Sequence, residues 1–202
     1  MRTARAMRPA ITAPGVATVV VVMVLLAFLA YLSTGPAVAT FGDLVRGHGG
    51  TAAEAEGGLP AGVTVFDDRY PGVANLDPDL LHALRTAAGD AARDGVKFQV
   101  NSGWRAPAYQ DRLLREAIAK YGSEQAAARW VAPVNKSAHV SGDAVDIGPD
   151  TAESWLSEHG TGYGLCQIYA NEPWHFELRP GAIGRGCPAQ YADAAQDPRM
   201  GS

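Results

Sequence analysis

Two histidines, an aspartate and a nearby glutamate form the strongest chemical pattern in the chain. His139 and Asp146 lie in the segment Ser137–Asp146, and Glu172 and His175 open and close the segment Glu172-Pro173-Trp174-His175. Two imidazoles and one carboxylate are a typical ligand set of a catalytic zinc ion, which keeps its fourth tetrahedral position for water. Zinc lowers the pKa of that water to about 7, and a carboxylate beside the ligands is suited to accept its proton. The pattern therefore predicts metal-assisted hydrolysis, with His139, Asp146 and His175 as ligands and Glu172 as base.

Neither histidine is decisive alone. A histidine in a Ser- and Gly-rich loop, as at His139, is usually only solvated, and His175 could equally be a hydrogen-bonded core histidine. The set is stronger because Glu172 stands just before His175. In addition, the small residues Gly142 and Ala144 leave room for a metal ion and a substrate.

Other titratable residues fit the site less well. Asp143 lies near His139, but on a strand it would point to the opposite face from Asp146, so we choose Asp146 as the ligand. Glu177 shares a strand face with His175 and is either a hydrogen-bonding partner of that imidazole or a plain surface acid. The remaining histidines fall in a linker, on a helix surface and at a helix end, and none is expected to bind metal: His48, His82 and His159.

The elements that must position these residues are helices interspersed with short strands. Asp77 followed by Pro78 is a typical helix start, and apolar residues at helical spacing continue until Gly95. Similar patterns predict helices over 107–121, 123–130 and 150–159, and strands over 96–101, 144–147, 166–169 and 174–178. Several strands follow one another too closely for crossover helices. We therefore expect an α+β fold with a small, mainly antiparallel sheet flanked by helices, in a single catalytic domain.

The alternation of side chains along the last strand supports the site. Trp174, Phe176 and Leu178 share one face, whereas His175 and Glu177 share the other. An imidazole on the face opposite three large apolar groups is available to a metal ion.

The N-terminal region predicts export. Within residues 16–34, the run from Val16 to Leu32 is uncharged and almost entirely aliphatic, is long enough to cross a bilayer, and follows Arg2, Arg5 and Arg8. By the positive-inside rule, residues 1–15 stay in the cytoplasm and the catalytic part lies outside. We favour an uncleaved signal anchor, which makes this a single-pass protein of the cell membrane. The alternative is a signal peptide cleaved after Ala39, because Ala37-Val38-Ala39 resembles a cleavage site and cleavage would release a secreted protein.

The rest of the chain divides by composition. Residues 35–58 are rich in small and polar residues and are predicted to form a linker. Residues 59–187 form the catalytic domain, and residues 188–202 form a loose polar tail. The net charge of −4 provides no large basic surface, so nucleic acid is not an expected partner.

The number and spacing of the cysteines are consistent with an exported protein that contains a disulfide. Cys166 and Cys187 are the only cysteines, and they do not form a C-x-x-C pattern, which argues against a thiolate zinc site. A disulfide between them is the favoured prediction for an exported protein, and two buried free thiols are the alternative.

Three motifs resemble those of the zinc D,D-peptidase family. Ser-x-His-x-x-Gly-x-Ala-x-Asp over 137–146 and Glu-x-Trp-His over 172–175 resemble its two signatures. Ser102-Gly103-Trp104-Arg105, with Gln110 further on, resembles its Ser-Gly-Tyr-Arg…Gln stretch. The resemblance spans roughly residues 76–179. The family includes vancomycin-resistance-type D,D-carboxypeptidases and D,D-dipeptidases, and it shares its fold with the Hedgehog signalling domain.

The resemblance implies a role for each matching residue. Zn²⁺ would be held by His139, Asp146 and His175, and Glu172 would move the proton. Arg105 would polarise the scissile carbonyl, and Gln110 and Ser137 would hold the substrate. Trp104 stands where the family usually has Tyr, so a hydroxyl contact is lost, although the indole can still pack on substrate.

The implied activity is that of a D,D-carboxypeptidase of the cell wall. It would remove terminal D-Ala from peptidoglycan stem pentapeptides or their lipid-linked precursors, which would also remove the group that glycopeptide antibiotics bind. L,D-carboxypeptidase and D,D-dipeptidase activities use the same zinc chemistry and stay open. A non-catalytic, zinc-stabilised cell-wall binding module is the alternative from another class, and Glu172 argues against it because a binding site needs no base.

Overall fold

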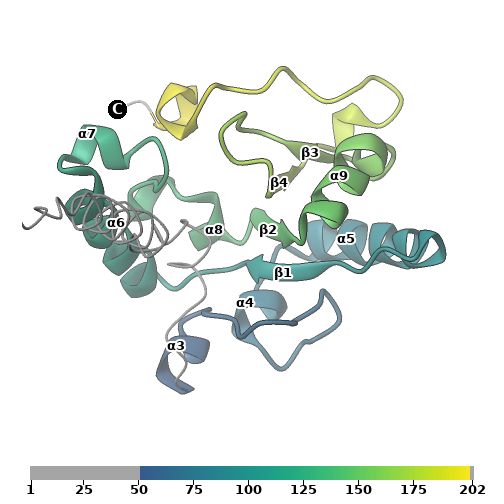
Figure 1. Ribbon diagram of the computed structural model, residues 1–202, viewed down its shortest axis with the longest axis horizontal. Coiled ribbons are helices and arrows are strands. Elements are labelled where there is room, and N and C mark those ends of the chain that lie inside the picture. The colour runs from purple at the N-terminus through teal and green to yellow at the C-terminus, as the bar shows by residue number, and fades with distance from the viewer. Residues whose placement is uncertain (1–50, 201–202) are drawn as a thin grey trace, which may run out of the picture. The chain divides into compact units, whose positions relative to one another are not determined.

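A four-stranded antiparallel sheet forms the centre of the computed structural model, which describes residues 51–200. The strands are β1 (Gln99–Ser102), β2 (Ala144–Gly148), β3 (Leu165–Gln167) and β4 (His175–Leu178), in the spatial order β1-β2-β4-β3 (Figure 1). The α+β class with a small antiparallel sheet is thus confirmed.

One face of the sheet is covered by two amphipathic helices, α5 (Pro78–Ala91) and α9 (Asp150–His159). α5 begins as its sequence predicts: the Asp77 carboxylate accepts hydrogen bonds from the backbone N–H groups of Asp79 and Leu80, at 2.9 and 3.0 Å. The core beneath these helices takes alternate residues from the strands, including Val145, Ile147 and Phe176. The intervening strand residues therefore face the other side of the sheet.

A second, smaller apolar cluster lies in the helical region beside the sheet. It joins α6 (Pro107–Tyr121) and α7 (Glu124–Ala127), which lie together on the left of Figure 1. Its buried members are Tyr109, Leu113, Ala117, Ala127 and Val131. The short remaining helices are α3 (Thr51–Ala55), α4 (Pro71–Ala74), η1 (Ala92–Asp94), η2 (Val134–Lys136), α8 (Ala138–Ser141), η3 (Gly160–Tyr163), η4 (Pro180–Ala182), η5 (Ala194–Gln196) and η6 (Pro198–Met200).

The folded part begins before residue 59, where the sequence places the end of a linker. The backbone N–H of Ala106 donates to the carbonyl of Glu56 at 2.8 Å. Gly57 has a φ of +100°, and a Cβ built on it would lie 2.1 Å from the carbonyl oxygen of Trp104. Only glycine fits this close approach, so residues 56–58 belong to the domain that carries the predicted catalytic residues.

The segment after Cys187 also differs from its prediction as a loose tail. Tyr191 forms a parallel bridge with Tyr169, and the side chains of Asp193 and Asp197 are buried. The predicted disulfide between Cys166 and Cys187 is present and ties the start of this segment to β3. We refer to residues 188–200 as the C-terminal segment. It is shown in yellow in Figure 1.

The predicted cytoplasmic residues 1–15, the predicted anchor over 16–34, most of the predicted linker and His48 lie outside the described residues. Within residues 51–200, no helix has both the length and the apolar character needed to cross a membrane.

Candidate active site

The predicted ligands His139, Asp146 and His175 meet in one buried cluster. One ligand atom from each lies within 4.8 Å of the other two. Oδ1 of Asp146 is 3.4 Å from Nε2 of His139 and 3.2 Å from Nδ1 of His175. Ligands held at about 2.0–2.2 Å around a tetrahedral zinc ion lie about 3.3 Å from one another, and both distances from Asp146 to the histidines match that spacing.

The sheet and one short helix place the three ligands. Asp146 on the central strand β2 is paired directly with His175 on β4, so their side chains lie side by side on the same face. His139 comes from α8, which ends at Gly142 with a φ of +85° before β2 begins. Nδ1 of His139 is 2.8 Å from the carbonyl oxygen of Gly103, and a proton on Nδ1 leaves Nε2 free to bind a metal ion.

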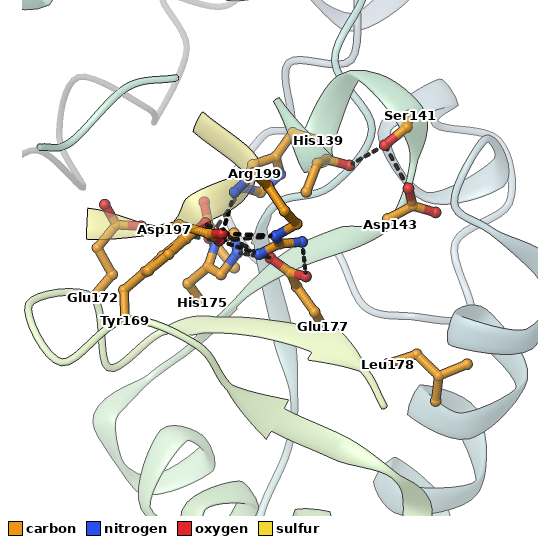
Figure 2. Close-up of polar contacts among 12 residues, drawn as sticks. His139, Ser141, Asp143, Tyr169, Glu172, His175, Glu177, Leu178, Asp197 and Arg199 are labelled. Atoms are coloured by element: carbon orange, nitrogen blue, oxygen red, sulfur yellow. Dashed lines mark hydrogen bonds and ion pairs between the residues drawn. The ribbon is translucent and has the colours of Figure 1, made fainter. Parts of the chain in front are cut away.

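Asp143 takes no part in the cluster. It precedes β2, and its exposed carboxylate accepts a hydrogen bond from Oγ of Ser141 at 2.6 Å, away from the histidines (Figure 2). The sequence argument rejected Asp143 for its strand orientation, whereas in the structure it belongs to the turn that joins α8 to β2.

The electrostatics around His175 favour a positive charge. Burial lowers the pKa of His175, but its hydrogen bonds with Asp146 and Glu177 outweigh burial and raise the pKa to about 10. Burial and the nearby Arg105 together lower the pKa of His139. The pKa of Asp146 is held well below its usual range, because the two histidines and Arg105 outweigh its burial. A site that holds carboxylates ionised around a buried imidazole suits a divalent cation.

Glu172 lies beside the ligands but is bound less tightly. Its Oε2 is 3.8 Å from Nδ1 of His175, and its buried Oε1 has no hydrogen-bond partner among the described residues. Burial raises the pKa of Glu172 to about 7. A buried carboxylate with an unpartnered oxygen and a pKa near neutrality has the properties of a general base.

Arg105 is fixed at the pocket by three side chains. Its guanidinium donates to Oδ2 of Asp146 at 3.0 Å, to Oγ of Ser102 at 2.8 Å and to Oε1 of Gln110 at 3.1 Å. The side-chain amide of Gln110 also donates to the carbonyl of Ala132 at 2.8 Å. Because both the oxygen and the nitrogen of its amide are hydrogen-bonded, Gln110 holds Arg105 against the backbone at Ala132.

The other two predicted substrate residues differ in position. Ser137 is buried and lines the same pocket as the ligands. Trp104 is only partly buried and is not among the side chains that line this pocket. Its backbone N–H donates to the carbonyl of Gly72, which fixes the turn leading to Arg105.

The ligand cluster faces a pocket that Arg105, Gln110 and Glu172 also line. Part of its wall was not predicted from the sequence: Trp130 and Val131, Tyr169, and Ala194 and Met200 of the C-terminal segment. Arg199 and Asp197 stand behind this wall in contact with Glu177 and Tyr169 (Figure 2). No motif marks the residues from the C-terminal segment, which lie in a polar stretch without a clear periodic pattern.

Comparison with known proteins identifies the family to which this chain belongs. Residues 73–180 match the family model of VanY, D-alanyl-D-alanine carboxypeptidase. The chain is 36% identical over 113 residues to a D-alanyl-D-alanine carboxypeptidase of Enterococcus faecalis, and the match covers 43% of this chain and 42% of that protein. The chain thus spans less than half the length of that relative.

Two solved structures are also similar. VanYB in complex with D-alanine-D-alanine is 26% identical, with a TM-score of 0.50, over 53% of this chain and 74% of that one. The D,D-pentapeptidase VanY from a VanB-type resistance cassette, in complex with Zn(II), is 28% identical, with a TM-score of 0.48, over 51% of this chain and 72% of that one. The family model covers more than half of the chain and includes both segments that form the His139–Asp146–His175 cluster, so this protein belongs to the VanY family of D-alanyl-D-alanine carboxypeptidases.

Proposed function

We propose that this protein is a zinc-dependent D,D-carboxypeptidase that removes the terminal D-Ala from peptidoglycan stem pentapeptides or their precursors. The observation that carries the proposal is the ligand geometry of His139, Asp146 and His175, with the unpartnered carboxylate of Glu172 beside them. Membership of the VanY family supports the carboxypeptidase class. The complex of VanYB with D-alanine-D-alanine supports the choice of substrate.

The three ligands would hold the ion through Nε2 of His139, Nδ1 of His175 and Oδ1 of Asp146. A zinc ion there would act as a Lewis acid and lower the pKa of a bound water. Oδ2 of Asp146 is engaged by Arg105, which leaves Oδ1 as the metal-facing oxygen. Asp146 would thus use one carboxylate oxygen for the ion and the other for the guanidinium of Arg105.

Glu172 would carry the proton. Its unpartnered oxygen would accept a proton from the attacking water and later donate it to the leaving amine of D-Ala. A pKa near neutrality suits both transfers. Arg105, which three side chains hold rigidly, would stabilise negative charge that develops on the carbonyl oxygen.

We also propose the cellular setting. The charge-free apolar run over 16–34 would anchor the protein, and the catalytic domain would act outside the cytoplasm. The disulfide between Cys166 and Cys187 supports an oxidising compartment. Loss of terminal D-Ala outside the cytoplasm would lower the affinity of the wall for glycopeptide antibiotics, which gives the enzyme a role in resistance.

The activity is tested by identifying the products that the full-length protein forms. A muramyl pentapeptide ending in D-Ala-D-Ala, the matching tetrapeptide and free D-Ala-D-Ala are incubated separately with zinc-loaded protein, and released D-Ala is quantified. We expect rapid release from the pentapeptide and little from the other two. Preference for the tetrapeptide would make the enzyme an L,D-carboxypeptidase, and preference for the free dipeptide would make it a D,D-dipeptidase. No release from any of them would favour the binding-module alternative.

A further inference from the structure

The side of His175 that faces away from the ligand cluster is enclosed by an ionic network from the C-terminal segment. Nε2 of His175 lies 3.2 Å from Oε1 of Glu177. Glu177 is fully buried, and Arg199 spans both of its oxygens: Nη2 donates to Oε1 at 3.0 Å and Nη1 to Oε2 at 2.7 Å. Figure 2 shows Arg199 lying over Glu177 and His175.

The same arginine also holds the aromatic ring that packs on His175. The ring centroids of Tyr169 and His175 are 5.0 Å apart. The hydroxyl of Tyr169 donates to Oδ2 of Asp197 at 2.9 Å and accepts from Nη2 of Arg199 at 3.3 Å. Arg199 and Asp197 form an ion pair with each other. The guanidinium of Arg199 therefore contacts both groups that fix the imidazole of His175: Glu177, which lies at its Nε2 atom, and Tyr169, which packs on its ring.

This arrangement has a physical consequence for Nδ1 of His175. A neutral imidazole whose Nε2 donates to a carboxylate must present an unprotonated Nδ1, which is the form that binds a metal ion. Nδ1 of His175 is the atom that lies 3.2 Å from Oδ1 of Asp146. Glu177 is itself fixed by Arg199, which contacts both carboxylate oxygens while Oε1 stays 3.2 Å from Nε2 of His175.

We propose that Arg199 is a positioning residue of the metal site, which acts through Glu177 to fix His175 in its metal-binding form. In this proposal the C-terminal segment supports the metal site, because it supplies Arg199. This inference rests on the proposed function, because it assigns a role toward the same ion.

Three tethers hold Arg199 in reach of Glu177. The disulfide at Cys187 joins the start of the segment to β3, and the bridge of Tyr191 with Tyr169 continues this attachment. Asp193 accepts a hydrogen bond from Nε of Arg129 at 2.8 Å, which ties the segment to the opposite wall of the pocket beyond α7. All three attachments lie before Arg199 in the chain. They therefore fix the backbone that leads to Arg199, and so the position of its side chain near Glu177.

Arg179 provides a matched control. Its guanidinium also pairs with Oε2 of Glu177, at 2.5 Å, but no hydrogen bond or ion pair among the described residues joins it to Tyr169 or Asp197. If Glu177 needs only a nearby positive charge, Arg179→Ala and Arg199→Ala should weaken zinc binding equally. If the two-oxygen contact and the link to Tyr169 matter, Arg199→Ala should have the larger effect.

The experiment measures zinc affinity of the full-length protein by competition with a chromophoric chelator. Loss of a residue that orients a metal ligand typically weakens metal binding by about 10–100-fold, and we expect this loss for Arg199→Ala. Arg199→Lys should recover only part of it, because an ammonium group cannot contact both carboxylate oxygens as a fork. The visible spectrum of the Co²⁺-substituted Arg199→Ala protein should also change, whereas that of Arg179→Ala should match the unaltered protein.

A double-mutant cycle tests whether Arg199 acts through Glu177. In a Glu177→Gln background the carboxylate charge is absent, so adding Arg199→Met should change zinc affinity far less than it does alone. Additive effects of the two substitutions would overturn the proposal. So would unchanged affinity and an unchanged Co²⁺ spectrum in Arg199→Ala and Arg199→Met.

The controls separate the sources of failure. Thermal melting of the zinc-free variants distinguishes a misfolded protein from a folded one with a weakened site. If Arg199→Ala does not fold, the comparison of Arg199→Lys with Arg179→Ala decides, and equal zinc affinities of those two variants would overturn the proposal. Failure of the unaltered protein to bind one zinc ion would instead contradict the proposed function.

Discussion

At the scale of single residues, the account depends on Glu172 being a base and not a ligand. Its Oε2 lies 3.8 Å from the metal-facing atom of His175, and its Oε1 is buried without a partner among the described residues. The group of residues whose ligand atoms all lie within 4.8 Å of one another contains His139, Asp146 and His175 but not Glu172. The two carboxylates are therefore separated by geometry as well as by pKa.

Replacing Glu172 should abolish turnover but leave the metal in place. We predict that Glu172→Gln lowers kcat by about 10²–10⁴-fold, since the amide cannot accept the proton, while one zinc ion per chain stays bound. Metal analysis of the purified protein and the rate of D-Ala release would check this. Glu158→Gln, at an exposed glutamate, is the control. Full activity of Glu172→Gln with bound zinc would show that another group is the base.

The pH dependence follows from the same residue. Burial raises the pKa of Glu172 to about 7 in the metal-free site, and a bound cation favours the carboxylate and lowers that pKa again. The base works only when ionised, so kcat/KM should fall as the pH decreases, with the midpoint of the acid limb at or below about pH 7. A pH–rate profile of the zinc-loaded enzyme measures this midpoint. A midpoint clearly above 7 would contradict the assignment.

At the scale of elements, the register of the sheet decides which aspartate lies beside the two histidines. Asp146 pairs with His175 across β2 and β4, whereas Asp143 sits in the turn before β2. Period-two alternation predicted the metal-facing side of β4, because Phe176 needed the apolar core and His175 then had to face the other way. Helix α5 was predictable for a similarly local reason, its Asp77-Pro78 start.

The register of β2 and β4 predicts opposite effects for substitutions of Asp146 and Asp143. Asp146→Asn should lose stoichiometric zinc and with it activity, because the amide is a poor zinc ligand and leaves Arg105 without its buried counter-charge. Asp143→Asn should keep both, because its carboxylate is exposed and accepts a hydrogen bond from Ser141 in the turn, away from the histidines. Metal content and D-Ala release of the two variants are compared side by side. Loss of zinc from the Asp143 variant alone would place the ligand in the turn.

At the scale of the whole molecule, the C-terminal segment marks the limit of prediction from sequence. The motifs that form the site lie within residues 102–175, where local spacing and strand alternation apply. Arg199 and Asp197 have no such pattern around them, and the partner Glu177 lies 22 residues before Arg199. A short polar stretch looks the same in sequence whether it is solvated or ion-paired to a buried carboxylate.

The disulfide between Cys166 and Cys187 leads to a prediction about the stability of the whole domain. It closes a loop with a sequence separation of 21 residues, for which the chain-entropy model gives about 3 kcal/mol of stability. Replacing Cys166 and Cys187 together by Ser should lower the free energy of unfolding by about that amount, measured by denaturant titration. Unchanged stability would mean that the tertiary contacts of the segment hold it without the bridge.

Zinc titration of the chelator-stripped full-length protein is the most direct test of the central claim. D-Ala release from a muramyl pentapeptide is measured after each addition. The account predicts no release before zinc is added and a linear rise that levels off at one equivalent, since residues 51–200 provide one such set of three ligands. Full release from the stripped protein, or a plateau at an equivalence other than one, would contradict it.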